Sequence, residues 1–257
     1  MTRSSTDGRR GGGRVPRQMR VETGHHNGSP APARPFRHPN ESAKNRLVYR
    51  TFEAALRAAA ERYARGRLID VGGGRKPWQP IFAPHVAEHL CVDHVEKDDG
   101  RGQVVDVIAT AYSIPLPDGE AQTILLTEVL EHLERPGDAV AECLRLLEPG
   151  GHLIATTPLF WPVHDARDFY RYTPQGLRYL LETAGFEVVE LEPLGGLWST
   201  VAVELSYGLQ RYRRPWSAPA VDATCRSMQW LAPRWERVDR QPKFSWNHLV
   251  VGRRPLA

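Results

Sequence analysis

The sequence predicts an α/β fold: a mostly parallel seven-stranded sheet with helices on both faces and an antiparallel last strand. Short apolar runs alternate with amphipathic helical segments, which is the pattern of βαβ units. The first run leads directly into Gly72-Gly73-Gly74. A final apolar run, 246–252, comes after a long helical stretch, so we expect it to add to the sheet in the antiparallel direction.

The first helix is expected over residues 45–66. Its apolar side chains recur at helical spacing and form one stripe: Leu47, Phe52, Ala55, Leu56, Ala59, Ala60 and Tyr63. Residues 67–71 then read as a short buried strand that ends at the three glycines.

Further strands are expected at 89–93, 103–107, 123–127 and 152–157. A helix lies between the last two. We expect Asp138 to cap it and Pro149-Gly150-Gly151 to end it, and its apolar face holds Ala139, Val140, Cys143, Leu144 and Leu147.

The next helix is expected to begin with Thr173 as its N-cap and Pro174 as its first helical residue, and to end at Gly185. A strand at 186–191 follows. Residues 195–240 are less regular: 197–212 fit a helix with an apolar face, and 213–240 are rich in Trp, Pro and Arg. We expect 195–240 to be a helical insertion on the side of the domain where the substrate would bind.

The positive charge lies in the N-terminal segment. The 257-residue chain has a net charge of +4, and residues 1–40 carry eight arginines against Asp7 and Glu22, or +6, which leaves −2 for the rest. With Gly11-Gly12-Gly13, many prolines and no apolar periodicity, residues 1–44 are expected to be a disordered tail before a domain at 45–257. The tail is either a simple extension, with Met19 as an alternative start, or an arm for RNA or an acidic surface.

The remaining composition restricts the class of protein. No apolar run approaches the roughly 18 residues of a membrane span, and the N-terminus lacks the apolar core of a secretory signal. The three cysteines, at 91, 143 and 225, are spaced neither as a metal knuckle nor as a disulfide framework. We expect a cytoplasmic protein without a metal site.

The glycine turn after the first strand is a candidate cofactor site, because glycines allow close approach of a ligand to backbone N–H groups. Tight packing is the alternative reading. In the dinucleotide pattern GxGxxG the third glycine would fall at 77, where the chain has Pro77, and the P-loop pattern is absent. Asp93, about 20 residues further on, suits ribose hydroxyls, and Asp70 suits a cationic amino group. This combination favours S-adenosylmethionine over NAD.

Five stretches carry a resemblance to a known family: LIDVGGGRKPW (68–78), CVDH (91–94), IPLPDG (114–119), TEVLEHLERPGDAVAECLRLLEPGGHLIATTP (127–158) and HDARDFYRYTPQGLRYLLETAGFEVVE (164–190). The chain resembles the class I S-adenosylmethionine-dependent methyltransferases, in particular the small-molecule "type 11" group. The resemblance covers about 45–192 and the last strand, and it implies a Rossmann-like fold.

The resemblance also implies a set of cofactor contacts. Gly72, Gly73 and Gly74 would pass under the methionine and ribose, Asp70 would hold the amino group, and Asp93 would bind the ribose hydroxyls. The remaining expected contacts are Val92 and His94 beside the adenine, Thr110 with its neighbour Ala111, and Glu128 in the crevice. Thr110 departs from the family, which has an Asp there for the adenine amino group.

Methyl transfer from a sulfonium depends chiefly on alignment, and a base helps when the acceptor is a hydroxyl. His164 is the first candidate for that base and His132 the second, although each has a structural reading as a hydrogen-bonded loop or helix-start residue. The aromatic loop 159–172 is either a structural plug or a lid over the acceptor. For the lid, the expected contact residues are Trp161, Tyr170, Arg171 and Tyr172.

Absent motifs narrow the acceptor. The [DNS]PPY tetrapeptide of amino-methylating DNA enzymes is replaced by Thr127-Glu128-Val129-Leu130, and no Pro-Cys pair is present. We expect O-methylation of a small molecule, a sugar or glycan, or a lipid-linked intermediate. The alternatives are a nucleic-acid methyltransferase that uses the basic tail and a non-catalytic protein that binds S-adenosylmethionine.

Overall fold

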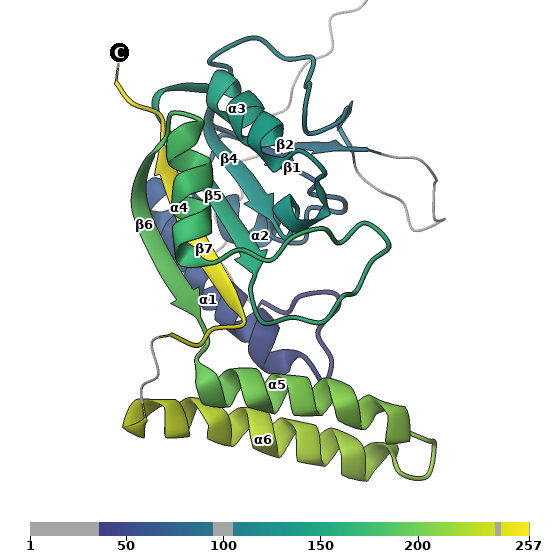
Figure 1. Ribbon diagram of the computed structural model, residues 1–257. Helices are drawn as coiled ribbons and strands as arrows, with labels where there is room; N and C mark the ends of the chain where they lie inside the picture. Colours follow the sequence, from purple (N-terminus) through teal and green to yellow (C-terminus); the bar gives the residue numbers. More distant parts are fainter. Residues whose placement is uncertain (1–35, 95–104, 240–242, 257) are drawn as a thin grey trace, which may run out of the picture. The chain divides into compact units, whose positions relative to one another are not determined.

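The fold is built on one seven-stranded sheet, in the order β3-β2-β1-β4-β5-β7-β6 (Figure 1). The structure is a computed structural model that describes residues 36–94, 105–239 and 243–256. Its strands are β1 (Arg67–Val71), β2 (Glu88–Asp93), β3 (Val107–Ile108), β4 (Ala121–Thr127), β5 (Leu147–Pro158), β6 (Glu187–Leu194) and β7 (Asn247–Arg253). The helices are α1 (Arg46–Tyr63), α2 (Gln79–Phe82), α3 (Pro136–Leu146), α4 (Pro174–Thr183), α5 (Leu197–Leu209) and α6 (Ala218–Val238), with short 3₁₀ turns η1 (Leu130–His132) and η2 (Gln210–Tyr212).

The strand directions confirm the predicted sheet. β1 pairs in parallel with both β2 and β4, and β4 pairs in parallel with β5. β7 inserts between β5 and β6 and runs antiparallel to both. Because β1 is flanked by β2 on one side and β4 on the other, the strand order reverses between β1 and β4, and ligands of open α/β sheets bind beside the carboxyl ends of such strands.

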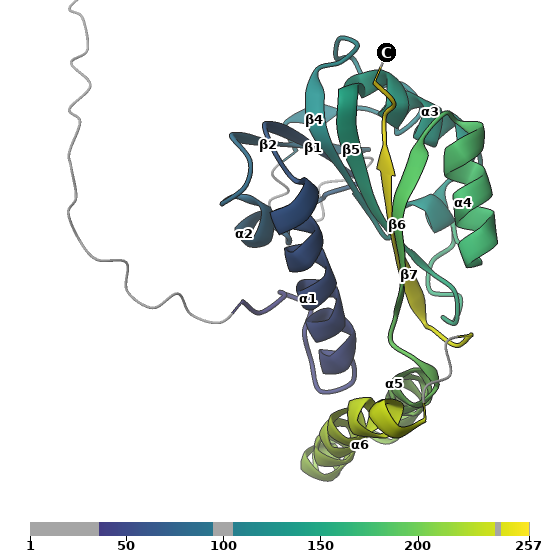
Figure 2. The ribbon, with the colours of Figure 1, turned by 90° about the vertical axis from the view of Figure 1, so that its left-hand side faces the viewer.

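Helices α1 and α2 cover one face of the sheet, and α3 and α4 cover the other (Figure 2). An apolar cluster lies on each face. Successive strand residues point to opposite faces, so Leu68 packs with α1 and α2 whereas Ile69 packs with α3 and α4. Buried helix side chains in these clusters include Phe52, Leu56, Ala59, Ala60, Ile81 and Phe82 on one face, and Val140, Cys143, Leu177 and Leu181 on the other.

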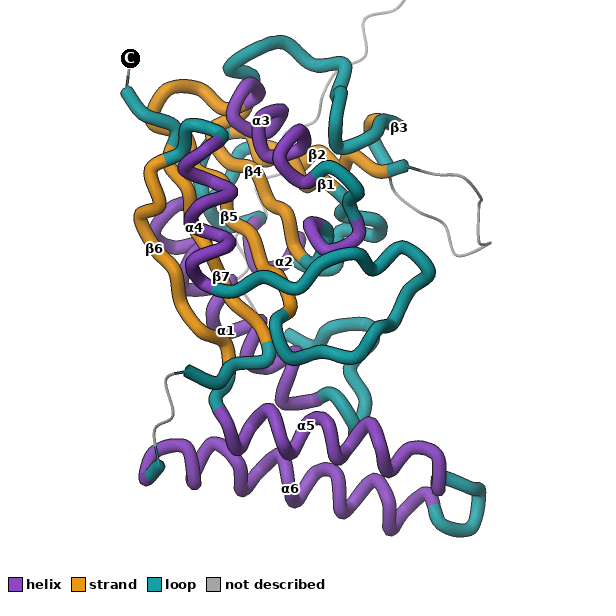
Figure 3. The backbone as a smooth tube through the Cα atoms, in the orientation of Figure 1, coloured by secondary structure: helices purple, strands orange, loops and turns teal. Residues whose placement is uncertain are grey.

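Residues 195–240 contain a pair of helices, α5 and α6, which lie side by side (Figure 3). Gln229 of α6 joins this pair to α1: its Nε2 donates to Ser206 Oγ of α5 at 2.9 Å, and its Oε1 accepts from the backbone N–H of Leu47 at 2.8 Å. The helix predicted from apolar spacing at 197–212 is present as α5 and η2, whereas α6 lies in the segment 213–240, for which no apolar spacing was identified. Within the described residues, no helix is both long and apolar enough to cross a membrane.

The helix boundaries agree with the sequence pattern except at the two ends of α3. This helix ends at Leu146, because Leu147 and the predicted stop Pro149-Gly150-Gly151 already belong to β5. Thr173 caps α4 as predicted, since its Oγ1 accepts from the backbone N–H of Gly176 at 3.1 Å. Asp138 was expected to cap α3, and this prediction was wrong. The helix begins earlier, at Pro136, whose fixed φ favours the first helical position, and Asp138 lies in the first turn with an ion pair to Arg135 at 2.7 Å.

The segment 36–44, which we had assigned to the tail, packs on the domain. The ring of His38 stacks on Tyr49 with centroids 4.0 Å apart, and Phe36 and His38 both lie against Trp78. These contacts place the boundary before Phe36 instead of at residue 44, because aromatic burial offsets the cost of ordering the chain. The prediction for residues 1–35 lies outside the described residues, and so do residues 103 and 104 of the strand predicted at 103–107. The strand found there is β3, Val107–Ile108, which shares only Val107 with the prediction.

Candidate active site

A cavity of about 390 Å³ opens at the carboxyl ends of β1 and β4, where the strand order reverses. Gly72, Gly73 and Glu128 line it from the sheet. Aromatic side chains and a histidine from later segments form another part of its wall: Trp161, His164, Tyr207 and Trp246. Its volume falls within the range of small-molecule sites. A larger cavity of about 540 Å³ lies between α1 and α6, and its lining includes neither the glycine turn nor Glu128.

The glycine turn has the backbone geometry that its sequence predicted. Gly72 and Gly74 have φ angles of +74° and +50°, which favour glycine. The N–H of Gly72 donates to the carbonyl of Val92 at 2.8 Å, so the turn is fastened to β2. A Cβ on Gly72 would lie 2.6 Å from Val129 Cγ2, so the position has no room for a side chain.

Asp93, at the end of β2, faces this turn. Its Oδ2 accepts from the backbone N–H of Gly74 at 3.0 Å, and its Oδ1 accepts from the N–H of His94 at 2.6 Å. Two backbone donors thus fix the orientation of the carboxylate. The carboxylate stands beside the turn, where the resemblance places the ribose of the cofactor.

Asp70 lies beneath the turn instead of at its surface. Its carboxylate is fully buried, Oδ2 is 3.0 Å from His89 Nε2, and a Cβ on Gly73 would lie 2.4 Å from its Cγ. Burial raises the pKa of Asp70. Its Oδ1 is buried and has no hydrogen-bond partner among the described residues, so this acceptor is left for a donor that enters beneath Gly73.

The other predicted cofactor residues surround the β2–β3 edge. The side chain of Val92 is buried, and His94 is exposed at the end of β2. Thr110 is exposed two residues after β3 and forms a backbone bridge with Ser113, while Ala111 packs against the core on the α3 and α4 face. The cofactor contacts of these four residues remain predictions.

Glu128 occupies the crevice with a strained backbone. Its φ is +54°, a conformation that costs a residue with a Cβ roughly 1–2 kcal/mol. Its N–H donates to the carbonyl of Thr156 at 3.1 Å, and its Oε1 accepts from Asn247 Nδ2 at 2.8 Å, so β5 and β7 hold it in place. Burial raises the pKa of Glu128. A strained residue held this firmly beside a cavity is typical of a functional site.

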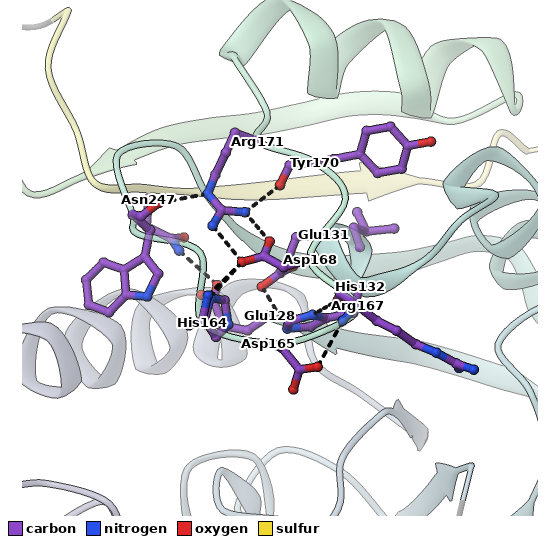
Figure 4. A network of polar contacts seen from close by, with 12 residues as sticks. Glu128, Glu131, His132, His164, Asp165, Arg167, Asp168, Tyr170, Arg171 and Asn247 are labelled. Carbon is purple, nitrogen blue, oxygen red and sulfur yellow. Dashed lines mark hydrogen bonds and ion pairs between the residues drawn. The ribbon is translucent and has the colours of Figure 1, made fainter.

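The two candidate histidines lie next to each other (Figure 4). Their ring centroids are 5.0 Å apart. His132 Nδ1 is hydrogen-bonded to the carbonyl of Arg167, and His164 Nδ1 lies 3.1 Å from Asp168 Oδ2. Each histidine therefore has the hydrogen bond or ion pair that its structural interpretation requires. The two rings are also in contact with each other, and His164 lines the cavity.

Arg171 stabilises the loop 159–172 through hydrogen bonds to other residues of the same loop. It forms two contacts with the buried Asp168 carboxylate, one at 2.8 Å from Nη2 to Oδ2, and its Nε donates to the carbonyl of Trp161 at 3.1 Å. The hydrogen bond from Arg171 holds the pKa of Asp168 below its ordinary range. This arrangement fixes the loop beside the cavity.

The predicted acceptor residues divide into two groups. Trp161 lines the cavity, whereas the described lining residues do not include Tyr170, Arg171 or Tyr172. The hydroxyl of Tyr172 donates to the carbonyl of Leu130 at 3.0 Å from a buried position, and that of Tyr170 donates to the carbonyl of Glu134 at 3.1 Å. These tyrosines tie the loop to the segment after β4.

Two features of the site were missed in the sequence. Glu131 is fully buried, neither of its carboxylate oxygens has a hydrogen-bond partner among the described residues, and burial together with the Glu128 charge raises its pKa to about 9. Its position between Glu128 and His132 in EVLEHL could have signalled it. His38 and Asn40 also line the cavity, and their Pro- and Arg-rich surroundings gave no such signal.

Comparisons with known proteins agree with this geometry. Residues 43–191 match the family described as "Methyltransferase domain". A probable S-adenosylmethionine-dependent methyltransferase of Mycolicibacterium smegmatis is 29% identical over 158 residues, which cover 57% of this chain and 62% of that protein. The chain thus spans less than two thirds of this relative's length.

Solved structures share the fold at low identity. The [4+2]-cyclase SpnF has a TM-score of 0.55 and 20% identity, with 80% of this chain and 81% of that chain covered. The 1,6-didemethyltoxoflavin-N1-methyltransferase of Burkholderia thailandensis, solved with S-adenosylhomocysteine, has a TM-score of 0.50 and 16% identity, with 84% and 80% covered.

The family match spans more than half of the chain and includes the glycine turn, Asp93, Glu128 and the loop 159–172. The chain therefore belongs to the methyltransferase-domain family and is related to the class I S-adenosylmethionine-dependent methyltransferases.

Proposed function

We propose that the protein transfers the methyl group of S-adenosylmethionine to a hydroxyl of a small organic acceptor, such as a sugar or glycan, or a lipid-linked intermediate. The supporting observation is the cavity, which joins Gly72 and Gly73 to a wall of aromatic side chains and to His164. Aromatic walls suit apolar or sugar-like molecules, and a cavity of about 390 Å³ suits a small ligand better than a polymer surface.

The residues around the glycine turn fit the cofactor. The turn leaves backbone exposed at Gly72, and Gly74 has open space above it apart from Asp93 Oδ2 at 3.7 Å from a Cβ built there. Asp93 would hold the ribose hydroxyls, and the unused Oδ1 of Asp70 would accept from the amino group, directly or through water. The bound cofactor supplies an electrophilic methyl group on a sulfonium.

The chain's own residues would align the acceptor and manage its proton. Trp161 and Trp246 lie with ring centroids 6.2 Å apart and form an apolar wall that orients a flat or cyclic molecule. The Nδ1 of His164 is oriented by Asp168, so its Nε2 can accept the proton of an acceptor hydroxyl. His132 is the second candidate, since it adjoins His164 without lining the cavity.

The test measures S-adenosylhomocysteine formation with hydroxylated metabolites, glycans, lipid-linked sugars and nucleic acids as separate acceptor pools. We expect turnover with one of the first three. In Trp161→Ala, KM for that acceptor should rise at least about tenfold while cofactor affinity stays within about twofold. Trp216→Ala is the matched control, because Trp216 is 85% exposed and does not line the cavity.

Two results would contradict the proposal. One is a preference for nucleic acid with strongly salt-dependent binding, which would mark a phosphate-backbone partner. The other is an equal KM for the acceptor in Trp161→Ala and Trp216→Ala.

A further inference from the structure

We propose that Glu131, His132 and His164 form a binding site for a divalent first-row transition-metal cation at the edge of the cavity. One possible ligand atom from each of the three side chains lies within 4.8 Å of those of the other two. Figure 4 shows these side chains where the loop 159–172 meets the turn after β4. Three such atoms lie at most about 2.8 Å from a common centre, so shifts of roughly 0.7 Å would bring them to the usual metal–ligand distance of about 2.1 Å.

Both imidazoles are oriented as metal-binding histidines are. The Nδ1 of His132 faces a carbonyl oxygen of Arg167, and the Nδ1 of His164 faces Asp168 Oδ2 at 3.1 Å and the carbonyl of Pro162 at 3.4 Å. These oxygens can only accept, so each Nδ1 carries the hydrogen and each Nε2 keeps its lone pair. A ligating histidine characteristically donates its other N–H to a carbonyl or a carboxylate.

Glu131 supplies an independent observation. Its side chain is fully buried, and both carboxylate oxygens lack a hydrogen-bond partner among the described residues. Oε1 lies 3.7 Å from His132 Nε2. Buried carboxylate oxygens are nearly always satisfied by donors or by a cation, and the nearby guanidinium of Arg171 is engaged by Asp168 and by three backbone carbonyls. A cation bound by Glu131 and the two imidazoles would satisfy these oxygens.

The donor set indicates which metals fit. Two imidazoles and one carboxylate suit Mn²⁺, Co²⁺ or Zn²⁺, whereas Mg²⁺ and Ca²⁺ prefer sites made of oxygen atoms. Three protein ligands leave coordination positions open for water or substrate. His164 and Glu128 both line the cavity, so the open positions would face the space where the acceptor is proposed to lie.

The role of the ion, though not its binding, rests on the proposed function. A divalent cation that binds an acceptor hydroxyl lowers the pKa of that hydroxyl and orients its oxygen. The proton would then leave to water, and the two histidines would hold the ion instead of acting as bases. The reaction still forms one C–O bond and breaks the C–S bond of the sulfonium.

The test measures binding of Mn²⁺ alone to the full chain, after treatment with a chelator, by the loss of the free Mn²⁺ signal in electron paramagnetic resonance. We expect one Mn²⁺ per chain. His164→Ala and His132→Ala should each weaken binding at least about tenfold. Glu131→Gln keeps the side-chain volume and should do the same. His164 has a side chain that is 37% exposed, so its replacement tests the site even if the Glu131 variant fails to fold. His85→Ala, outside the cluster, is the matched control and should bind as the parent does.

Binding of none of Mn²⁺, Co²⁺ or Zn²⁺ up to about 1 mM would overturn the proposal. Equal Mn²⁺ affinity in the parent and in the His132→Ala/His164→Ala double variant would also overturn it. Turnover of a hydroxyl acceptor that persists in excess chelator would refute the role of the ion and leave the proposed function intact. Metal binding that depends on the two histidines, without turnover of any hydroxyl acceptor, would support the site and count against the proposed function.

Discussion

The backbone N–H of Gly74 donates a hydrogen bond to Asp93 Oδ2 at 3.0 Å and so links the turn after β1 to the carboxylate at the end of β2. A second donor, the N–H of His94, holds Oδ1. Each oxygen keeps a further lone pair, so the carboxylate can accept from two ribose hydroxyls without rotating. A cofactor held by this carboxylate would meet a site that is oriented before binding, which would lower the entropic cost of binding.

Asp93→Ala should weaken S-adenosylmethionine binding at least about tenfold, because hydrogen bonds to a charged acceptor contribute roughly 1.5–3 kcal/mol each. Isothermal titration measures this affinity. Asp138→Ala, an exposed carboxylate in the first turn of α3, is the control and should bind the cofactor normally. If Asp93→Ala binds as tightly as the parent, Asp93 does not hold the ribose.

Gly72→Ala should weaken cofactor binding and lower the free energy of unfolding by about 1–3 kcal/mol. The φ of +74° disfavours alanine, and its Cβ would lie 2.6 Å from Val129 Cγ2. Gly137→Ala is the matched control, since a Cβ there meets nothing within 4 Å. The two variants are compared by urea denaturation and by titration with the cofactor. Equal stability and affinity in both would contradict a steric requirement at Gly72.

The sequence could predict those parts of the site that local pattern determines. Gly72 follows β1 directly and Asp93 is the last residue of β2, and parallel strands place their carboxyl ends at one edge of the sheet. Tyr172 could not be placed, because an aromatic residue in a loop can face either the core or a ligand. Its hydroxyl reaches Leu130 only through the three-dimensional path of the chain. The buried state of Glu131 likewise depends on long-range packing.

Glu128→Gly should be about 1 kcal/mol more stable than Glu128→Ala, because glycine tolerates the φ of +54° and alanine does not. Both variants lose the hydrogen bond from Asn247, so the comparison isolates the backbone strain. We expect turnover to fall in both. Urea denaturation gives the stabilities, and a less stable glycine variant would show that Glu128 is not strained.

A chain that begins at residue 45 should melt several degrees lower than one that begins at residue 36. The longer chain keeps the contacts of Phe36 and His38 with Trp78 and the stacking of His38 on Tyr49. It should match the full chain within about 2 °C, as the composition of residues 1–35 predicts. Differential scanning calorimetry compares all three. Equal melting of the chains that begin at 36 and 45 would show that the aromatic contacts contribute nothing to stability.

His152 should make the stability of the protein sensitive to pH. It is buried on β5, with Nδ1 3.3 Å from Arg65 Nη1, and burial together with the charges of Arg65 and Arg253 lowers its pKa to about 4. In the unfolded chain a histidine has a pKa near 6.5. Between about pH 6.5 and pH 4 the unfolded chain therefore binds a proton that the folded protein does not. The contribution of neutral His152 is fully present above pH 6.5 and is lost as pH falls toward 4, by up to about 1.4 kcal/mol per pH unit.

His152→Gln removes this titration while keeping an acceptor for Arg65. We expect the variant to be less stable than the parent at pH 7.5 and the difference to shrink as the pH falls to 4.5, since only the parent loses this contribution. Urea denaturation at several pH values measures the free energies of unfolding of the parent and the variant. The control is the same comparison for His85→Gln. Because other titrating groups are common to parent and variant, they cancel in the difference. If the difference in the free energy of unfolding between the parent and His152→Gln stays constant from pH 7.5 to 4.5, the fold does not keep His152 neutral.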